Sequence, residues 1–195
     1  MIVTILWNLI IATGFLSCVI IAAWIWFHFP DRTADDVIDF LLPVDLEKAE
    51  RLIDANAETH LRCDLSGRDF RKMQRKRIHL YVALVNRMAH NAAVLIDWAN
   101  REAEGGDEQA AMLARDLQQI AIEVRLYSLL TMMKLRLWLL IRLDSWQLLP
   151  APSLYEVREV GGILGLESYD RLKTAASFLF LEMGCGNFEE LLQNL

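Results

Sequence analysis

The sequence predicts an all-α protein: an N-terminal single transmembrane helix followed by a compact helical bundle with two long central helices and short flanking helices. Residues 1–27 contain no Asp, Glu, Lys, Arg or His, and apolar residues recur at helical spacing after them. The chain shows no alternating run of β-branched residues and no Asn-Gly hairpin signal. The expected segments are a transmembrane anchor over 1–29, acidic juxtamembrane short helices over 30–65 and the bundle domain over 66–195.

The apolar N-terminal run is long enough to cross a membrane, because a bilayer core of about 30 Å requires about 20 apolar residues in a helix. Trp24, Trp26, Phe27 and Phe29 form an aromatic collar where the helix would leave the lipid. No Lys or Arg precedes the run, which favours a retained anchor over a cleaved signal peptide. The residues before Cys18 loosely resemble a lipoprotein cleavage site, but the apolar run continues after that cysteine.

Basic residues beside the anchor predict its orientation. Arg32, Lys48 and Arg51 follow the run, whereas only the α-amine precedes it. Lys and Arg near a membrane span are retained on the cytoplasmic side. We therefore expect a single-pass protein of the cell membrane with residues 30–195 in the cytoplasm, and an external bundle is the alternative. The three cysteines, an odd number, fit a reducing compartment.

Capping signals divide the rest of the chain into helices. Thr33 and Asp36 form a capping pair before a short helix that Pro43 ends, and Asp45 can cap the next helix. Ser66 with Asp69 three residues later forms a capping box, and it starts a long helix expected to run to about residue 99. The inward side of this helix has steps of three and four residues: Ile78, Tyr81, Val85, Met88, Ala92, Leu95 and Ala99.

A second long helix is expected from about residue 107 to residue 149. Its first half has one apolar stripe, and its second half, over 126–143, is apolar nearly all round. Lys134 and Arg136 near the middle of that half argue against a second span, since a central charge costs about 2.5–3.5 kcal/mol. Burial within the bundle is favoured, and a membrane-interfacial helix is the alternative. The stripe is Leu113, Leu117, Ile120 and Val124. A third helix is expected near 168–183, after the glycine-rich "GGILG".

The stretch "RDFRKMQRKR" concentrates positive charge in a chain whose formal charge is −6. Residues 68–77 carry six bases and one acid, whereas residues 31–67 carry ten acids and four bases. On a helical wheel, five of these cations lie opposite the apolar side, and Arg77 falls at its edge. They form the candidate surface for an anionic partner or for lipid: Arg68, Arg71, Lys72, Arg75 and Lys76. Their counterpart is the acidic upstream segment, anionic lipid headgroups or an acidic protein.

No motif predicts catalysis, a cofactor or a metal site. The G-x-S-x-G, H-E-x-x-H and P-loop patterns are absent from the sequence. His60 and Cys63 are the only close pair of potential metal ligands, and a zinc site needs two more. The acidic charge of the chain and the lack of a recognition motif make nucleic acid an improbable partner.

These observations predict a non-enzymatic, membrane-anchored helical interaction or scaffold protein, such as an accessory subunit of a membrane assembly. The lipid bilayer would hold residues 1–29, and a protein partner or a second copy of the chain would bind the bundle. The candidate apolar interaction surface is Met132, Met133, Leu137, Trp138 and Ile141. The alternatives are an interfacial lipid-binding protein and a membrane-tethered enzyme with a cleft between helices, which would require Arg87, His90, Asn91 and Asp97 to converge in a pocket.

Overall fold

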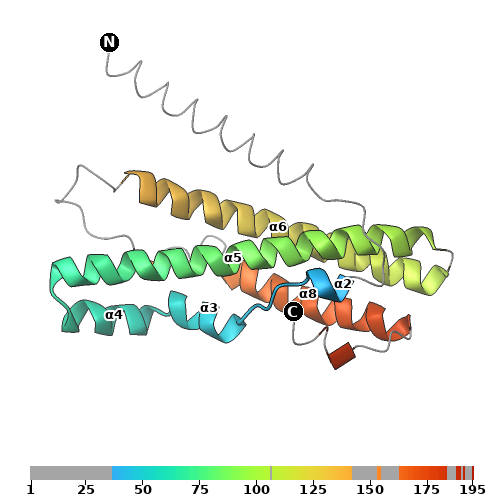
Figure 1. Ribbon diagram of the computed structural model, residues 1–195, viewed down its shortest axis with the longest axis horizontal. Coiled ribbons are helices and arrows are strands. Elements are labelled where there is room, and N and C mark those ends of the chain that lie inside the picture. Colours follow the sequence, from blue (N-terminus) through green and yellow to red (C-terminus); the bar gives the residue numbers. More distant parts are fainter. Residues whose placement is uncertain are drawn as a thin grey trace, which may run out of the picture. The chain divides into compact units, whose positions relative to one another are not determined.

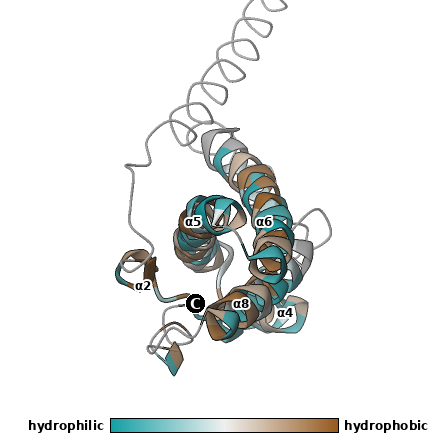
Figure 2. Cartoon of the chain, turned by 90° about the vertical axis from the view of Figure 1, so that its right-hand side faces the viewer, coloured by the Kyte–Doolittle hydropathy of each residue, from teal (hydrophilic) through white to brown (hydrophobic). Residues whose placement is uncertain are grey.

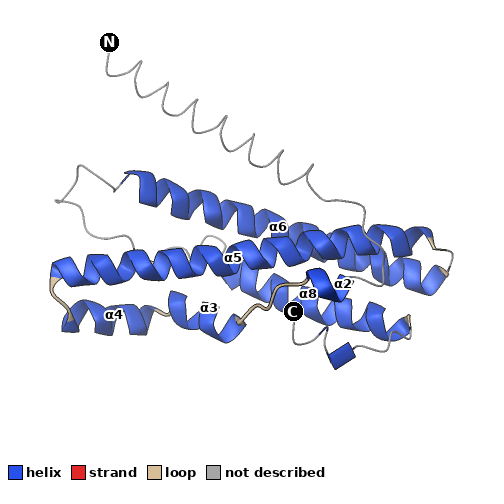
Figure 3. Ribbon diagram, viewed as in Figure 1, coloured by secondary structure: helices blue, strands red, loops and turns tan. Residues whose placement is uncertain are grey.

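The computed structural model describes residues 37–105, 107–141, 153–154, 163–183, 188–189, 191 and 195. Within these ranges every regular element is an α-helix and none is a strand (Figures 1 and 3). The predicted helical bundle with two long central helices is therefore confirmed. The predicted anchor over residues 1–29 lies outside the described residues. None of the described helices combines the length and the apolar character that a membrane span requires.

Three short helices precede the long ones: α2 (Val37–Phe40), α3 (Leu46–Ile53) and α4 (Ala55–Asp64). Asp45 caps α3 as predicted, because its carboxylate accepts a 2.9 Å hydrogen bond from the backbone N–H of Lys48. The division between α3 and α4 was not predicted. Asp54 causes it, with extended backbone at ψ 125° and carboxylate oxygens that accept from two backbone N–H groups of α4.

Helix α5 (Gly67–Glu104) is the first long helix. The Ser66 hydroxyl accepts from the Asp69 backbone N–H at 3.3 Å and donates to the Asp69 carboxylate at 2.6 Å, so the predicted cap is confirmed. All seven residues of the predicted inward side are buried. The helix continues one turn beyond the expected end at Ala99 and stops at Gly105.

Helix α6 (Glu108–Ile141) is the second long helix, and the expected end at residue 149 lies outside the described residues. Its buried row differs from the predicted stripe, because Leu113 and Ile120 are only partly buried. Small residues take the central positions instead, which lets the helix backbones approach closely. The buried row has steps of three and four residues: Ala114, Leu117, Ala121, Val124, Ser128, Thr131 and Leu135.

Helix α8 (Ile163–Glu182) packs along α6, which also packs along α5. Figure 2 shows α6 beside both helices, with α2 on the other side of α5. The helix begins before the expected residue 168, inside "GGILG". A Cβ placed on Gly165 would lie 3.6 Å from the Cβ of Tyr127, so α6 and α8 are close at this point. The short helix α3 contacts both α5 and α8.

Candidate functional site

The five cations of the candidate anionic-partner surface lie on the first three turns of α5, and all five are exposed. We call this set the basic face: Arg68, Arg71, Lys72, Arg75 and Lys76. Phe70 and Gln74 on the opposite side of these turns are buried, so the helix displays its charge to solvent. Arg68, Lys72, Arg75 and Lys76 make no ion pair or hydrogen bond with any described residue. These four charges therefore have no counterpart in the described part of the chain.

Four of the acidic residues upstream of the basic face are engaged elsewhere. Asp45 and Asp54 cap α3 and α4 through backbone N–H groups. Glu47 forms an exposed ion pair with Arg51. Glu58 turns inward and is only 4% exposed. Within the described residues, no acid of the upstream segment pairs with the four unpaired cations of the basic face.

Glu58 belongs to a buried polar network with Gln74 and Arg77. One of its carboxylate oxygens accepts from Gln74 Nε2 at 3.0 Å and from the Leu154 backbone N–H at 2.9 Å. Arg77 lies 4.0 Å from the same carboxylate and donates to the Leu52 carbonyl at 2.7 Å. Burial lowers the pKa of Arg77, and the charges of Glu58 and Asp54 raise it. The sixth base of the basic stretch is therefore a core residue that fixes α4 against α5.

Three of the four polar residues named for the tethered-enzyme alternative contact backbone groups. Arg87 donates to the Pro43 carbonyl at 3.1 Å, and His90 Nε2 lies 3.0 Å from the Phe40 carbonyl. The amide of Asn91 pairs with both backbone groups of Leu42, each at 2.8 Å. These side chains hold residues 40–43 on α5.

Asp97, the fourth residue named for a catalytic cleft, interacts electrostatically with Arg125 of α6. Burial lowers the pKa of Arg125, and the negative charge of Asp97 raises it. The negative charge of Asp97 on α5 thus partly compensates the burial of the Arg125 guanidinium on α6. The four polar residues do not line the groove described below, so their positions do not support the tethered-enzyme alternative.

Helix α6 has a row of large apolar side chains on its exposed side. The exposed fractions of Ile122, Leu126, Leu130 and Met133 lie between 38% and 54%. Polar Ser128 and Thr131 are buried on the other side of the same turns. This half of α6 therefore presents leucines to solvent and buries hydroxyl groups, the reverse of an ordinary surface helix. We call these four residues the α6 stripe.

The candidate apolar surface predicted from the sequence overlaps the α6 stripe only at Met133. Met132 is buried, at 6% exposure, because it points to the core side of the helix. Trp138 is partly buried, and Lys134 Nζ lies 5.1 Å from its ring centroid. The side chains of Leu137 and Ile141 lie outside those that the structure describes. Sequence reasoning missed Ile122, Leu126 and Leu130, although their spacing of four residues marks one helix face.

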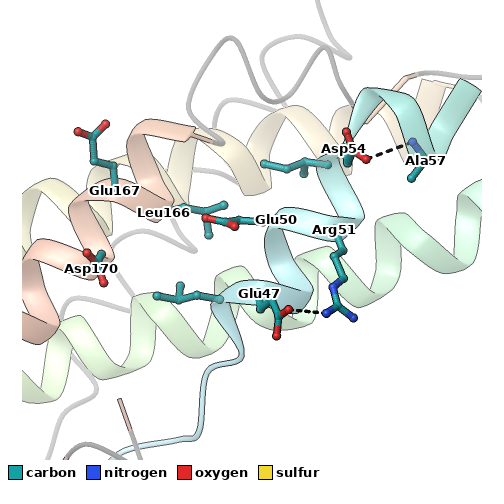
Figure 4. Close-up of a pocket in the computed structure, with 10 residues that line it drawn as sticks. Glu47, Glu50, Arg51, Asp54, Ala57, Leu166, Glu167 and Asp170 are labelled. Carbon is teal, nitrogen blue, oxygen red and sulfur yellow. Dashed lines mark hydrogen bonds and ion pairs between the residues drawn. The ribbon is translucent and has the colours of Figure 1, made fainter.

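A groove of about 1030 Å³ lies between α3 and α8. Its apolar lining comes from Leu46, Ile53, Ala57 and Leu166. Around these lie five carboxylates and one guanidinium, a net charge of −4: Glu47, Glu50, Asp54, Glu167, Asp170 and Arg51. Figure 4 shows Glu50 projecting from α3 in the direction of α8. We call this feature the acidic groove; nothing in the sequence pattern predicted it.

The described residues contain no group of three or more His, Cys, Asp or Glu side chains arranged to hold a metal ion. His60 and Cys63, the one close pair of potential ligands in the sequence, are both exposed on α4. Comparison of the chain with protein-family models, curated proteins and solved structures found no significant match.

Proposed function

We propose that this protein is a membrane-anchored, non-enzymatic interaction protein whose helical bundle binds a protein partner through the α6 stripe. The observation that carries the proposal is the exposure of Ile122, Leu126, Leu130 and Met133 above buried Ser128 and Thr131. Exposed apolar side chains gathered on one face are typical of protein or membrane contact sites. Anchorage rests on the apolar run over residues 1–29.

The spacing of the α6 stripe suits a partner helix. Its members follow one another at four, four and three residues, and they extend over about 16 Å of helix at 1.5 Å per residue. An amphipathic helix binds such a row with its own apolar residues at three- and four-residue spacing. The proposed partner is therefore a protein with an exposed apolar helix face, such as another subunit of a membrane assembly.

The proposed setting is the cytoplasmic side of the cell membrane, because the basic residues that follow the anchor favour that orientation. The same setting places the bundle near anionic headgroups. A helix with a leucine row beside Lys134 and Arg136 is also compatible with a position in the membrane interface. The experiment must therefore distinguish a protein from lipid at the α6 stripe.

The test is site-specific photocrosslinking in intact cells that express the full chain. A photoreactive amino acid replaces Leu126 or Leu130. The matched control replaces Arg115, which is exposed on the same side of α6 two turns before Ile122. The proposal expects one discrete protein adduct from the two leucine positions and none from the control. Lipid adducts from the leucine positions would support the interfacial alternative. Absence of any adduct, or equal adducts at all three positions, would contradict the proposal.

A further inference from the structure

The acidic groove has more negative charge than the chain itself satisfies. Glu47 pairs with Arg51, and Asp54 caps α4. Glu50, Glu167 and Asp170 are exposed, and their carboxylates make no ion pair or hydrogen bond with any described residue. Three carboxylates thus surround a hollow whose floor is apolar. An occupant that fits must carry cations at its edges and apolar side chains between them.

One surface of the same chain has this composition. On α5, Met73 and Leu80 are exposed by 40% and 48%, and they lie on one side of the helix because they are seven residues apart. Lys72 and Lys76 lie beside them and are exposed without a partner among the described residues. We call these four residues the α5 ridge. It shares both lysines with the basic face and supplies an apolar pair with cations along one side.

The two surfaces also agree in length. Met73 and Leu80 are separated by two helical turns, about 10 Å. The acidic row on α3 from Glu47 to Asp54 has the same separation of seven residues. A helix laid along α3 can therefore face the whole row with one ridge. Long lysine side chains keep their ammonium groups at the edge while their stems cover apolar surface.

We infer that the acidic groove of one copy of this chain binds the α5 ridge of a second copy. Met73 and Leu80 enter the apolar floor beside Leu166, and Lys72 and Lys76 meet Glu50 and Asp170. In the symmetric dimer each copy donates a ridge and a groove, so the contact forms twice. The inference does not depend on the partner proposed for the α6 stripe, whose residues lie on another helix.

The α5 ridge fits the groove better than the α6 stripe does. Beside the α6 stripe, Glu123 pairs with Arg171, and Arg125 and Lys134 each have an interaction within the chain, so fewer cations there are available to a groove of net charge −4. The α5 ridge adjoins four cations that have no described partner. Complementary charge guides encounter and excludes wrong partners, so the unpartnered lysines favour the α5 ridge as the occupant.

The test is a charge exchange between two tagged full-length chains, co-expressed and purified in a non-ionic detergent. The ridge variant is Lys72→Glu with Lys76→Glu, and the groove variant is Glu50→Lys with Asp170→Lys. Each variant alone should lose self-association by about tenfold or more, because like charges then face each other. The ridge variant mixed with the groove variant should associate as the unaltered chain does, since both reciprocal contacts are again between opposite charges.

The control is Glu108→Lys with Asp116→Lys, which makes the same charge change at exposed carboxylates of α6 and should leave association intact. Leu126→Ser with Leu130→Ser should also leave it intact, which separates this inference from the proposed function. Thermal melts confirm that each variant is folded. Raising the salt should weaken association of the unaltered chain, because exposed charges are screened over about 8 Å at physiological ionic strength.

Three outcomes would overturn the inference. The first is a groove variant that associates as well as the unaltered chain. The second is a mixture of the two variants that does not recover association. The third is that both variants self-associate normally while the ridge variant binds less added phosphatidylserine than the unaltered chain, which would assign the ridge to lipid headgroups.

Discussion

Asn91 donates a 2.7 Å hydrogen bond to the hydroxyl of Tyr169, and this bond ties α5 to α8 inside the core. Both residues are fully buried. The same amide pairs with the backbone N–H and carbonyl of Leu42 at 2.8 Å each. One side chain therefore connects two long elements with the segment that follows α2, and its bond to Tyr169 is buried.

The first prediction concerns this amide. Asn91→Ala should lower the free energy of unfolding by about 2–4 kcal/mol, because it removes the buried bond to Tyr169 and both part-buried bonds to the Leu42 backbone. Urea unfolding of the full chain in detergent measures the change. Asn86→Ala, at an exposed position of the same helix, should stay within about 0.5 kcal/mol. Equal changes in the two variants would mean that the hydrogen bonds of Asn91 do not contribute to the free energy of unfolding.

The second prediction compares two buried tyrosines. Tyr169 accepts from Asn91, whereas the Tyr81 hydroxyl has no hydrogen bond to a described residue. Tyr169→Phe should therefore lower the free energy of unfolding by about 1 kcal/mol. Tyr81→Phe should leave it unchanged or raise it by up to about 1 kcal/mol, because it removes a buried polar group that gains nothing in return. A loss in Tyr81→Phe as large as that in Tyr169→Phe would contradict this assignment.

The third prediction is a loss of stability in alkali. Burial raises the pKa of Tyr81 from 10.0 to about 12, and burial also raises the pKa of Tyr169. Above pH 10 the unfolded chain releases these protons while the folded chain keeps them, so the stability present below that pH falls as the pH rises. Each tyrosine should cost about 1 kcal/mol between about pH 10 and 11.

Unfolding measured between pH 8 and about 11 tests this prediction, and Tyr81→Phe provides the internal comparison. That variant should lose less stability across the same interval than the unaltered chain, because one of the two perturbed groups is gone. Titration of exposed lysines is common to both chains and cancels in the difference. Identical pH profiles for the two chains would show that the hydroxyl of Tyr81 titrates as it does in the unfolded chain.

The sequence pattern was sufficient for α5 because its signals are local. Ser66 and Asp69 are three residues apart and cap the helix with their own atoms. The large apolar residues of its inward side all point to one side of the same helix, so a helical wheel identifies them. For α6 the wheel was misleading. Its second half has large apolar residues on every side, and the buried row follows the small Ala114 and Ala121.

The burial of Glu58 had no local signal. Its partners Gln74 and Leu154 lie 16 and 96 residues away in the sequence, and only the packing of α4 on α5 brings them together. In the sequence Glu58 is one of ten acids in residues 31–67, which suggests a solvated surface. The acidic groove was missed for the same reason, since Glu50 and Asp170 come from segments that meet only in the folded bundle.

The fourth prediction concerns that buried charge. Glu58→Leu should lower the free energy of unfolding by about 3–5 kcal/mol, because it leaves the guanidinium of Arg77 buried without its carboxylate. Adding Arg77→Met should recover a large part of the loss, since no unpaired charge then remains. The control is Glu47→Ala, which breaks the exposed pair with Arg51 and should cost less than about 1 kcal/mol. A double variant as unstable as Glu58→Leu would show that the lost backbone bond to Leu154, and not the charge, is decisive.

The fifth prediction tests the orientation of α6, on which the proposed function depends. Ser128 is buried, at 3% exposure, whereas Leu130 is 45% exposed two residues later. Ser128→Leu should lower the free energy of unfolding by about 1–3 kcal/mol, because the added atoms enter a packed row of small residues. Leu130→Ser should change it by no more than about 0.5 kcal/mol, although it removes a large apolar side chain. If Leu130→Ser were the more damaging change, α6 would be turned the other way, and the α6 stripe would be core instead of a surface for a partner.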